Sequence, residues 1–131
     1  MSAVASIVVA LIGLLHVYIL VLEMFLWDKP AGLRAFGNSQ AAATATKVLA
    51  ANQGLYNGFL AAGLFWGLFA GGKSVQVFFL LCVLVAGVYG GLTANRKIVF
   101  IQAIPAAFGL VMVLLFNTQR SDSAFRFSIQ I

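Results

Sequence analysis

Eight polar side chains within the apolar stretches of this sequence are candidates for binding or proton transfer. They are His16, Glu23, Asn52, Gln53, Tyr56, Asn57, Tyr89 and Gln102. A carboxylate and an imidazole can exchange protons, and amide and phenol groups can form directional hydrogen bonds. These residue types therefore predict a polar binding site inside an apolar protein, provided that the helices bring them together.

The composition indicates an integral membrane protein. The 131 residues are 63% hydrophobic and 8% charged, whereas a soluble domain is about 25% charged. A hydrocarbon core of about 30 Å needs about 20 apolar residues per helix. Four such runs are expected, at about residues 4–27, 48–70, 75–94 and 98–117. The predicted class is all-α: an integral membrane four-helix bundle with short loops, formed by one domain over residues 1–117.

The first apolar run is interpreted as a true span rather than a cleaved signal peptide. It lacks a basic first region, and it holds Glu23 where a small-residue cleavage pattern would be expected. The single cysteine, Cys82, gives no disulfide framework. One histidine and one acid within the spans are too few for a closed zinc site, so no metal site is predicted.

Lysine and arginine residues near the helix ends predict the orientation. The expected first and third loops carry Lys29, Arg34, Lys47, Arg96 and Lys97. The opposite side carries Lys73, Arg120 and Arg126. This difference predicts that loops one and three lie in the cytoplasm and that both termini lie outside. The net charge of +5 fits contact with anionic membrane lipids and gives no reason to expect nucleic acid as a partner.

Two segments lie outside the expected spans. The first, "WDKPAGLRAFGNSQAAATATK", is interpreted as an interfacial connection whose alanine-rich end begins the second helix. The second, residues 118–131, is a polar or amphipathic tail. Its alternation of Phe125, Phe127 and Ile129 with polar residues is a strand period. Disorder, a position at the membrane interface and pairing with a neighbouring chain stay open for this tail.

The depth of the eight polar residues indicates a shared site. Counted at about 1.5 Å per residue from the loop-one side, four of them fall in a layer about 6 to 9 Å deep: Glu23, Asn52, Gln53 and Gln102. The others lie deeper: His16, Tyr56, Asn57 and Tyr89. Because the opposite halves of the helices are nearly bare of polar side chains, we expect a blind pocket rather than a water-filled conduit.

Helical faces support the same interpretation. His16 and Glu23 fall within about 60° of one another on the first helix, whereas the polar residues of the second helix span about 140°. Small residues at every fourth position predict close helix packing, and the glycines expected to provide it are Gly54, Gly58, Gly87 and Gly91. Pro105 is expected to bend the fourth helix.

Each polar residue also has a simpler explanation. Amide side chains in membrane bundles often only link helices, for about 0.6 kcal/mol each. Glu23 can reach toward Lys29, Arg34 or a lipid headgroup, and His16 can donate to a backbone carbonyl. However, an acid within a span costs about 2.5 to 3.5 kcal/mol, and glutamine would meet a purely structural need at lower cost.

Several segments resemble one bacterial membrane-protein family in their order and spacing. They are "LLHVYILVLEMFLW", "KVLAANQGLYNGFLAAGLFWGL", "FFLLCVLVAGVYGGLT" and "IQAIPAAFGL". The family is the one catalogued as domain of unknown function 1304, and the resemblance covers about residues 4–116. It implies four transmembrane helices in about 120 residues and a location in a bacterial inner membrane. It implies no particular activity or cofactor.

Three functions remain open. The favoured one is binding or transport of a small polar or amphipathic molecule, with Glu23 or His16 exchanging a proton. The second is an accessory subunit or homo-oligomer that associates through its glycine ridges. The third is an enzyme acting on a lipid-soluble substrate with Glu23 and His16 as acid and base, although their spacing of about 10.5 Å along the helix axis weakens it. The cofactor is unknown.

Overall fold

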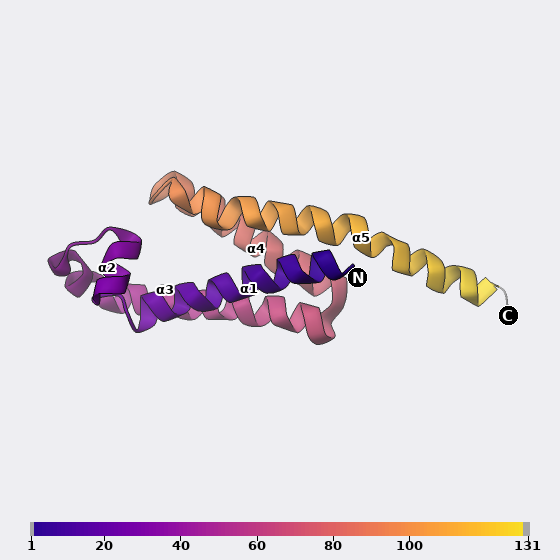
Figure 1. Cartoon of the computed structure of the whole chain (residues 1–131), viewed down its shortest axis with the longest axis horizontal. Helices are drawn as coiled ribbons and strands as arrows, with labels where there is room; N and C mark the ends of the chain where they lie inside the picture. Colours follow the sequence, from indigo (N-terminus) through magenta and orange to yellow (C-terminus); the bar gives the residue numbers. More distant parts are fainter. Residues whose placement is uncertain (1, 130–131) are drawn as a thin grey trace. The chain divides into compact units, whose positions relative to one another are not determined.

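The computed structural model describes residues 2–129, with the side chains of residues 2–116. The long helices are α1 (Ala3–Met24), α3 (Gln40–Trp66), α4 (Gly72–Thr93) and α5 (Ile104–Ile129), and a short helix, α2 (Pro30–Phe36), follows α1 (Figure 1). No strand occurs within residues 2–129. The predicted all-α class with four long helices is therefore confirmed.

Three helical stretches are long and apolar enough to cross a membrane: Ala3–Met24, Gln40–Thr93 and Val99–Phe116. The second has 54 residues, which at 1.5 Å per residue is about 81 Å, more than twice a hydrocarbon core. It is interrupted at Gly72, whose φ of 71° lies in the left-handed region that glycine adopts without strain. The chain turns there, so α3 and α4 are separate helices.

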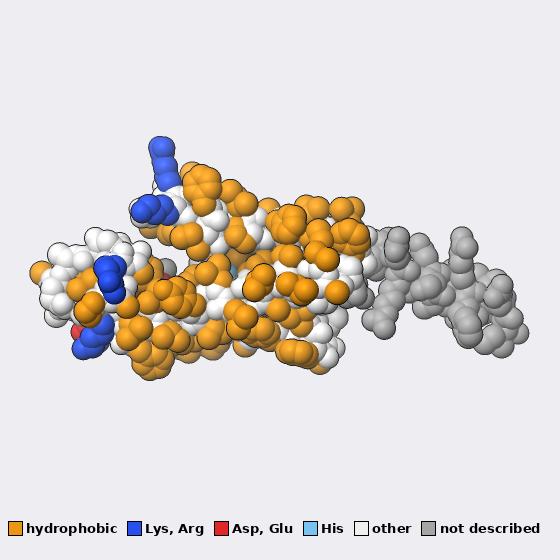
Figure 2. Space-filling view, in the orientation of Figure 1, with side chains coloured by type: hydrophobic (Ala, Val, Ile, Leu, Met, Phe, Trp, Pro, Cys, Tyr) orange, Lys and Arg blue, Asp and Glu red, His pale blue; other side chains and the backbone are white. Residues whose placement is uncertain are grey.

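Hydrophobic side chains cover much of the face drawn in Figure 2, whereas lysine and arginine gather around α2 and around the α4–α5 loop. This distribution follows from the sequence, because the helix interiors hold few charges. Membrane-spanning helices show the same distribution, with apolar sides in the hydrocarbon core and lysine and arginine near their ends.

Internal contacts divide the chain into two compact units. The α1–α3 unit is Gly13–Ala62, and the α4–α5 unit comprises the other described residues, 2–12 and 63–129. The division falls within α1 and within α3, so each unit contains part of both helices. The two units are described separately below.

Glycine sets the closest packing in the α4–α5 unit. A Cβ atom placed on Gly87 of α4 would lie 2.5 Å from the backbone nitrogen of Ala103, which directly precedes α5. Farther along, a Cβ atom on Gly109 of α5 would lie 3.3 Å from Cδ2 of Leu80 in α4. The contacts run in opposite directions along the two helices, which therefore form an antiparallel hairpin with closely approaching backbones.

A π-helix, η2 (Val99–Ala103), lies directly before α5. The sequence predicts a bend here because Pro105 has no backbone N–H to donate. In the structure, the N–H of Ile104 bonds to the carbonyl of Val99, five residues back. The wider turn thus occurs where the proline interrupts the regular hydrogen-bond pattern, and π-turns within helices often mark functional positions.

Loop one contains a helix that the sequence analysis did not predict. Helix α2 begins with Pro30, whose fixed φ suits a first helical turn, and ends at Gly37, whose φ of 69° is left-handed. Gly32 faces the end of α1: a Cβ atom there would lie 2.9 Å from Cα of Trp27. The helix α3 begins at Gln40, as the alanine-rich segment predicts.

The alternation of residues in the C-terminal tail suggests a strand, but the backbone there is helical. Helix α5 continues to Ile129. A helix that is already formed adds each residue at little cost, whereas the alternation covers only a few residues. The side chains of that tail lie outside the described residues.

Candidate functional site

The α1–α3 unit packs the last turns of α1 against α3 in antiparallel fashion. A Cβ atom on Gly54 would lie 2.7 Å from Cγ of Met24 and 2.9 Å from Cβ of Glu23. One turn later, a Cβ atom on Gly58 would lie 2.6 Å from Cδ1 of Leu20. Both predicted packing glycines thus face α1, and their lack of a side chain lets the two backbones approach closely.

This close approach joins Glu23 of α1 to Asn57 of α3. The Asn57 Nδ2 atom donates to Oε2 of Glu23 at 2.8 Å and to the backbone carbonyl of Gln53 at 3.2 Å. Glu23 is 4% exposed and Asn57 is 7% exposed. The acid and the amide therefore form a buried pair, and we regard this Glu23–Asn57 pair as the candidate site.

No cation neutralises Glu23 within the described part of the chain. The ion pair found there joins Lys47 Nζ to Asp28 Oδ2 at 3.0 Å, and the side chains of Lys29 and Arg34 are exposed. Glu23 therefore does not reach out to a surface cation, as the simpler explanation would require; its side chain is buried and bonds to Asn57. A buried acid whose hydrogen-bond partner is a neutral amide is unusual, because buried charges are normally paired with opposite charges.

His16 lies on α1, seven residues before Glu23, and it is fully buried. Seven residues correspond to about 10.5 Å along the helix axis. The hydrogen bond of Glu23 goes to Asn57. This arrangement gives no direct support to an acid–base pair of Glu23 and His16.

The other polar residues of α3 do not share the burial of Asn57. Asn52 and Gln53 are exposed. Tyr56 is 64% exposed, and its ring contacts Phe59 edge-on with the ring centroids 5.9 Å apart. An arc of about 140° is too wide for one helix to bury against a single neighbour, so one residue of the four faces Glu23 and three face outward.

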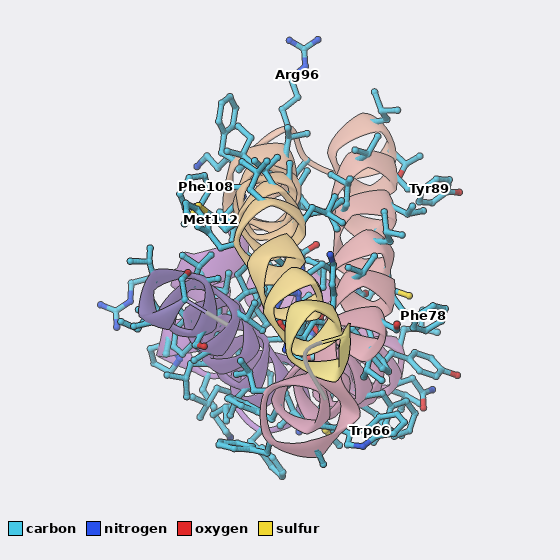
Figure 3. All side chains as sticks on the ribbon, turned by 90° about the vertical axis from the view of Figure 1, so that its right-hand side faces the viewer. Trp66, Phe78, Tyr89, Arg96, Phe108 and Met112 are labelled. Atoms are coloured by element: carbon cyan, nitrogen blue, oxygen red, sulfur yellow. The ribbon has the colours of Figure 1, made fainter. Side chains whose placement is uncertain are left out.

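The remaining predicted site residues belong to the α4–α5 unit. Tyr89 is 70% exposed, and Figure 3 shows it pointing away from the ribbon on the same side of α4 as Phe78. Gln102 is half-buried within the π-helix η2. The two packing glycines predicted here both lie against the next helical segment, Gly87 against Ala103 and Gly91 against Val99.

The outer end of the α1–α3 unit is held by a second polar group. The Trp27 Nε1 atom donates to Oγ1 of Thr46 at 3.1 Å, and the Trp27 ring packs against Phe36 of α2 with the centroids 4.7 Å apart. The Lys47 ammonium hydrogen-bonds Asp28 and holds the pKa of that carboxyl below its ordinary value. These contacts fix the ends of α1 and α3 beside the Glu23–Asn57 pair.

One buried polar residue, Gln76, was not predicted from the sequence. Gln76 of α4 is 2% exposed, and its Nε2 atom donates at 2.9 Å to the carbonyl of Gly67, the first residue of the π-helix η1 (Gly67–Gly71). Gln76 lies near the turn at Gly72, on the side expected to be nearly bare of polar groups, so that expectation is wrong for α4. An isolated amide in an apolar run was the available signal.

Comparison with known proteins identifies relatives of this chain. The family model described as "Protein of unknown function (DUF1304)" matches residues 10–114. The chain is also similar to the "Uncharacterized protein YpaA" of Lactococcus lactis subsp. lactis (strain IL1403), with 29% identity over 115 residues, which are 85% of this chain and 97% of that protein. No solved structure matches. The resemblance found in the sequence is confirmed, and neither description states an activity.

Proposed function

Because the chain belongs to the DUF1304 family, whose name states no activity, we propose a function from the Glu23–Asn57 pair itself. The protein is a small integral membrane protein that binds, and by binding can carry, a small polar or amphipathic molecule at this pair. The buried carboxyl of Glu23, bonded to a neutral amide, is the observation that carries this proposal.

The membrane setting is part of the proposal. Three helical stretches have the length and apolar character for insertion, and the relative YpaA comes from a bacterium. The excess of lysine and arginine in loops one and three supports an inner-membrane orientation with these loops in the cytoplasm. In this setting the exposed faces of the helices contact mainly membrane lipids.

The physical argument is one of cost. A carboxyl group inside a membrane span costs about 2.5 to 3.5 kcal/mol on insertion scales. Glutamine has nearly the same shape and would hydrogen-bond Asn57 without carrying a charge. A glutamate at this position is therefore better explained by a need for its charge or its proton than by packing.

The test compares small molecules that copurify with wild-type protein and with Glu23→Gln in lipid nanodiscs, identified by mass spectrometry. We expect a molecule enriched with wild type and lost in Glu23→Gln. Asp28→Asn is the matched control, since it makes the same acid-to-amide change outside the site and should retain the molecule. Identical lipid-only extracts from wild type and Glu23→Gln would contradict the proposal.

A second candidate function is an accessory subunit or homo-oligomer. It is favoured by the exposed amides of Asn52 and Gln53 on a helix that otherwise suits lipid, because amides in a membrane find partners on other helices. The predicted glycine ridges support it less, since Gly54 and Gly58 already face α1 of the same chain. Native mass spectrometry from nanodiscs should then show an oligomer that Asn52→Leu with Gln53→Leu dissociates and Glu23→Gln leaves intact.

A further inference from the structure

From the hydrogen bonds of the Glu23–Asn57 pair we infer the class of its ligand: a protonated primary or secondary amine with an apolar tail. The inference rests on the proposed function, because it names what the same site would bind. It follows from which polar atoms of the pair are already used and which are left.

The donors of the pair are used up. A neutral amide has two N–H groups, and those of Asn57 point to Glu23 Oε2 and to the carbonyl of Gln53. Both of these partners are acceptors, so the nitrogen of Asn57, and not its oxygen, must face them. The Asn57 Nδ2 atom therefore has no N–H left for a ligand.

The atoms that remain are acceptors. Within the described residues, the hydrogen bonds of the pair leave Oε1 of Glu23 and Oδ1 of Asn57 without a partner. A carboxylate accepts only, and an amide oxygen accepts only. A ligand that bonds to the ionised form of this pair must therefore donate, and a positive charge on it would offset the negative charge of Glu23.

The surroundings of the pair add an apolar requirement. Leu20 and Met24 flank Glu23 on α1, and both lie against the glycines of α3. Methionine is flexible and polarizable and adapts to irregular apolar shapes. An ammonium group placed at the two oxygens would thus leave the rest of the molecule beside aliphatic side chains.

The same chemistry disfavours other ligand classes. An anion would meet two acceptor oxygens and the charge of Glu23. A divalent metal ion such as calcium takes six to eight oxygen ligands, and the described residues contain no group of three or more His, Cys, Asp or Glu that could hold a metal. An ammonium has three N–H donors, which suits two protein acceptors and one further contact.

The experiment measures binding of three probes with the same ten-carbon chain: decylammonium, decanol and decyl sulfate. Full-length protein is held in nanodiscs of zwitterionic lipid, and empty nanodiscs provide the partition background. We expect decylammonium to bind wild type at least tenfold tighter than decanol, and decyl sulfate to bind no more than background. In Glu23→Gln the tenfold preference should disappear, whereas Asp28→Asn should keep it.

The outcomes separate this inference from the proposed function. Equal binding of decylammonium and decanol to wild type would overturn the amine assignment without using any variant. A neutral or anionic molecule that copurifies with wild type and is lost in Glu23→Gln would overturn it as well, while upholding the proposed function. Absence of both a copurifying molecule and probe binding would overturn the two together.

Discussion

The two units of this protein use the same packing device for different buried contents. In both, a glycine lets one helix backbone approach the next, at Gly54 in the α1–α3 unit and at Gly87 in the α4–α5 unit. The first unit encloses an acid bonded to an amide. The second encloses the amide of Gln76, which bonds to the backbone carbonyl of Gly67. Close packing alone thus does not require a buried charge, and the α1–α3 unit is the better place to look for chemistry.

The sharpest test of this contrast removes Asn57. In Asn57→Leu, Glu23 loses its amide donor while it stays buried, and leaving a buried polar group without its hydrogen-bond partner costs about 1 to 3 kcal/mol, or more when the group is charged. We expect a loss of that size in the free energy of unfolding, measured by SDS titration in mixed micelles with helicity as the signal.

The double variant Glu23→Leu with Asn57→Leu is the control for that result. Replacing both partners by apolar groups of similar size can be nearly neutral, so the double variant should be more stable than Asn57→Leu alone. If the double variant loses as much stability as the single one, the pair owes its importance to shape and not to a buried polar group.

Alanine at the packing glycines should affect the units unequally. In Gly87→Ala the new methyl would meet the backbone nitrogen of Ala103 at 2.5 Å, and backbone atoms cannot turn aside. In Gly58→Ala the methyl would meet the end of the Leu20 side chain at 2.6 Å, which can rotate away. We expect a loss of about 2 kcal/mol for Gly87→Ala, within the usual cost of overpacking, and under about 1 kcal/mol for Gly58→Ala.

The same SDS titration measures this pair of variants. Equal losses in the two would mean that Leu20 is as rigidly held as a backbone. The α1–α3 unit would then be no more adaptable than the α4–α5 unit, contrary to what a ligand site beside Leu20 needs.

Gln76→Leu should cost less than Asn57→Leu. The carbonyl of Gly67 also accepts the N–H of Gly72, so it keeps one hydrogen bond after the change. In addition, the Gln76 Oε1 atom is buried without a hydrogen-bond partner in the described structure, and leucine removes that unfavourable group. We expect a loss of about 1 kcal/mol or less in the free energy of unfolding. A loss as large as that of Asn57→Leu would make the two buried amides equivalent and remove the contrast.

The sequence predicts the helices and part of the site. Long apolar runs with glycines at fixed spacing leave the chain few alternatives to close-packed helices. In the structure, Gly54 and Gly58 lie against residues of α1. The short helix α2 was not predicted, because proline and glycine within a few residues of each other usually indicate a loop. Both residues instead mark the two ends of that helix.

The sequence did not predict which polar residue of α3 faces Glu23. The depth count placed Asn52 and Gln53 level with Glu23, and Asn57 deeper, whereas in the structure Asn57 bonds to Glu23. The choice depends on the axial register of α3 against α1, which is fixed by how Leu20 and Met24 pack on the glycines. That register selects Asn57 and turns the other two amides outward.

The smallest effect expected is the pH dependence of the Asp28–Lys47 pair at the outer end of the α1–α3 unit. Hydrogen bonding by Lys47 lowers the pKa of Asp28 in the folded protein, with smaller contributions from the charges of Lys47 and Lys29. A carboxyl whose folded pKa lies below its unfolded value of about 3.9 binds more protons when unfolded. Its contribution to stability is therefore complete above the unfolded pKa, and it is lost as pH falls through the lowered, folded pKa.

The unfolding free energies of wild type and Asp28→Asn, measured between pH 7 and pH 3, test this prediction. We expect the difference in unfolding free energy to be constant at neutral pH and to vanish as the pH falls below about 4, because Asp28 is then protonated in wild type. The difference should be small, since the Lys47 side chain is exposed to solvent. A gap that widens toward acid would mean that Asp28 is stabilised in its protonated form, which the ion pair with Lys47 does not allow. The ion pair with Lys47 would then not account for the role of Asp28, and the distinction between a structural acid and a functional one within the α1–α3 unit would fail.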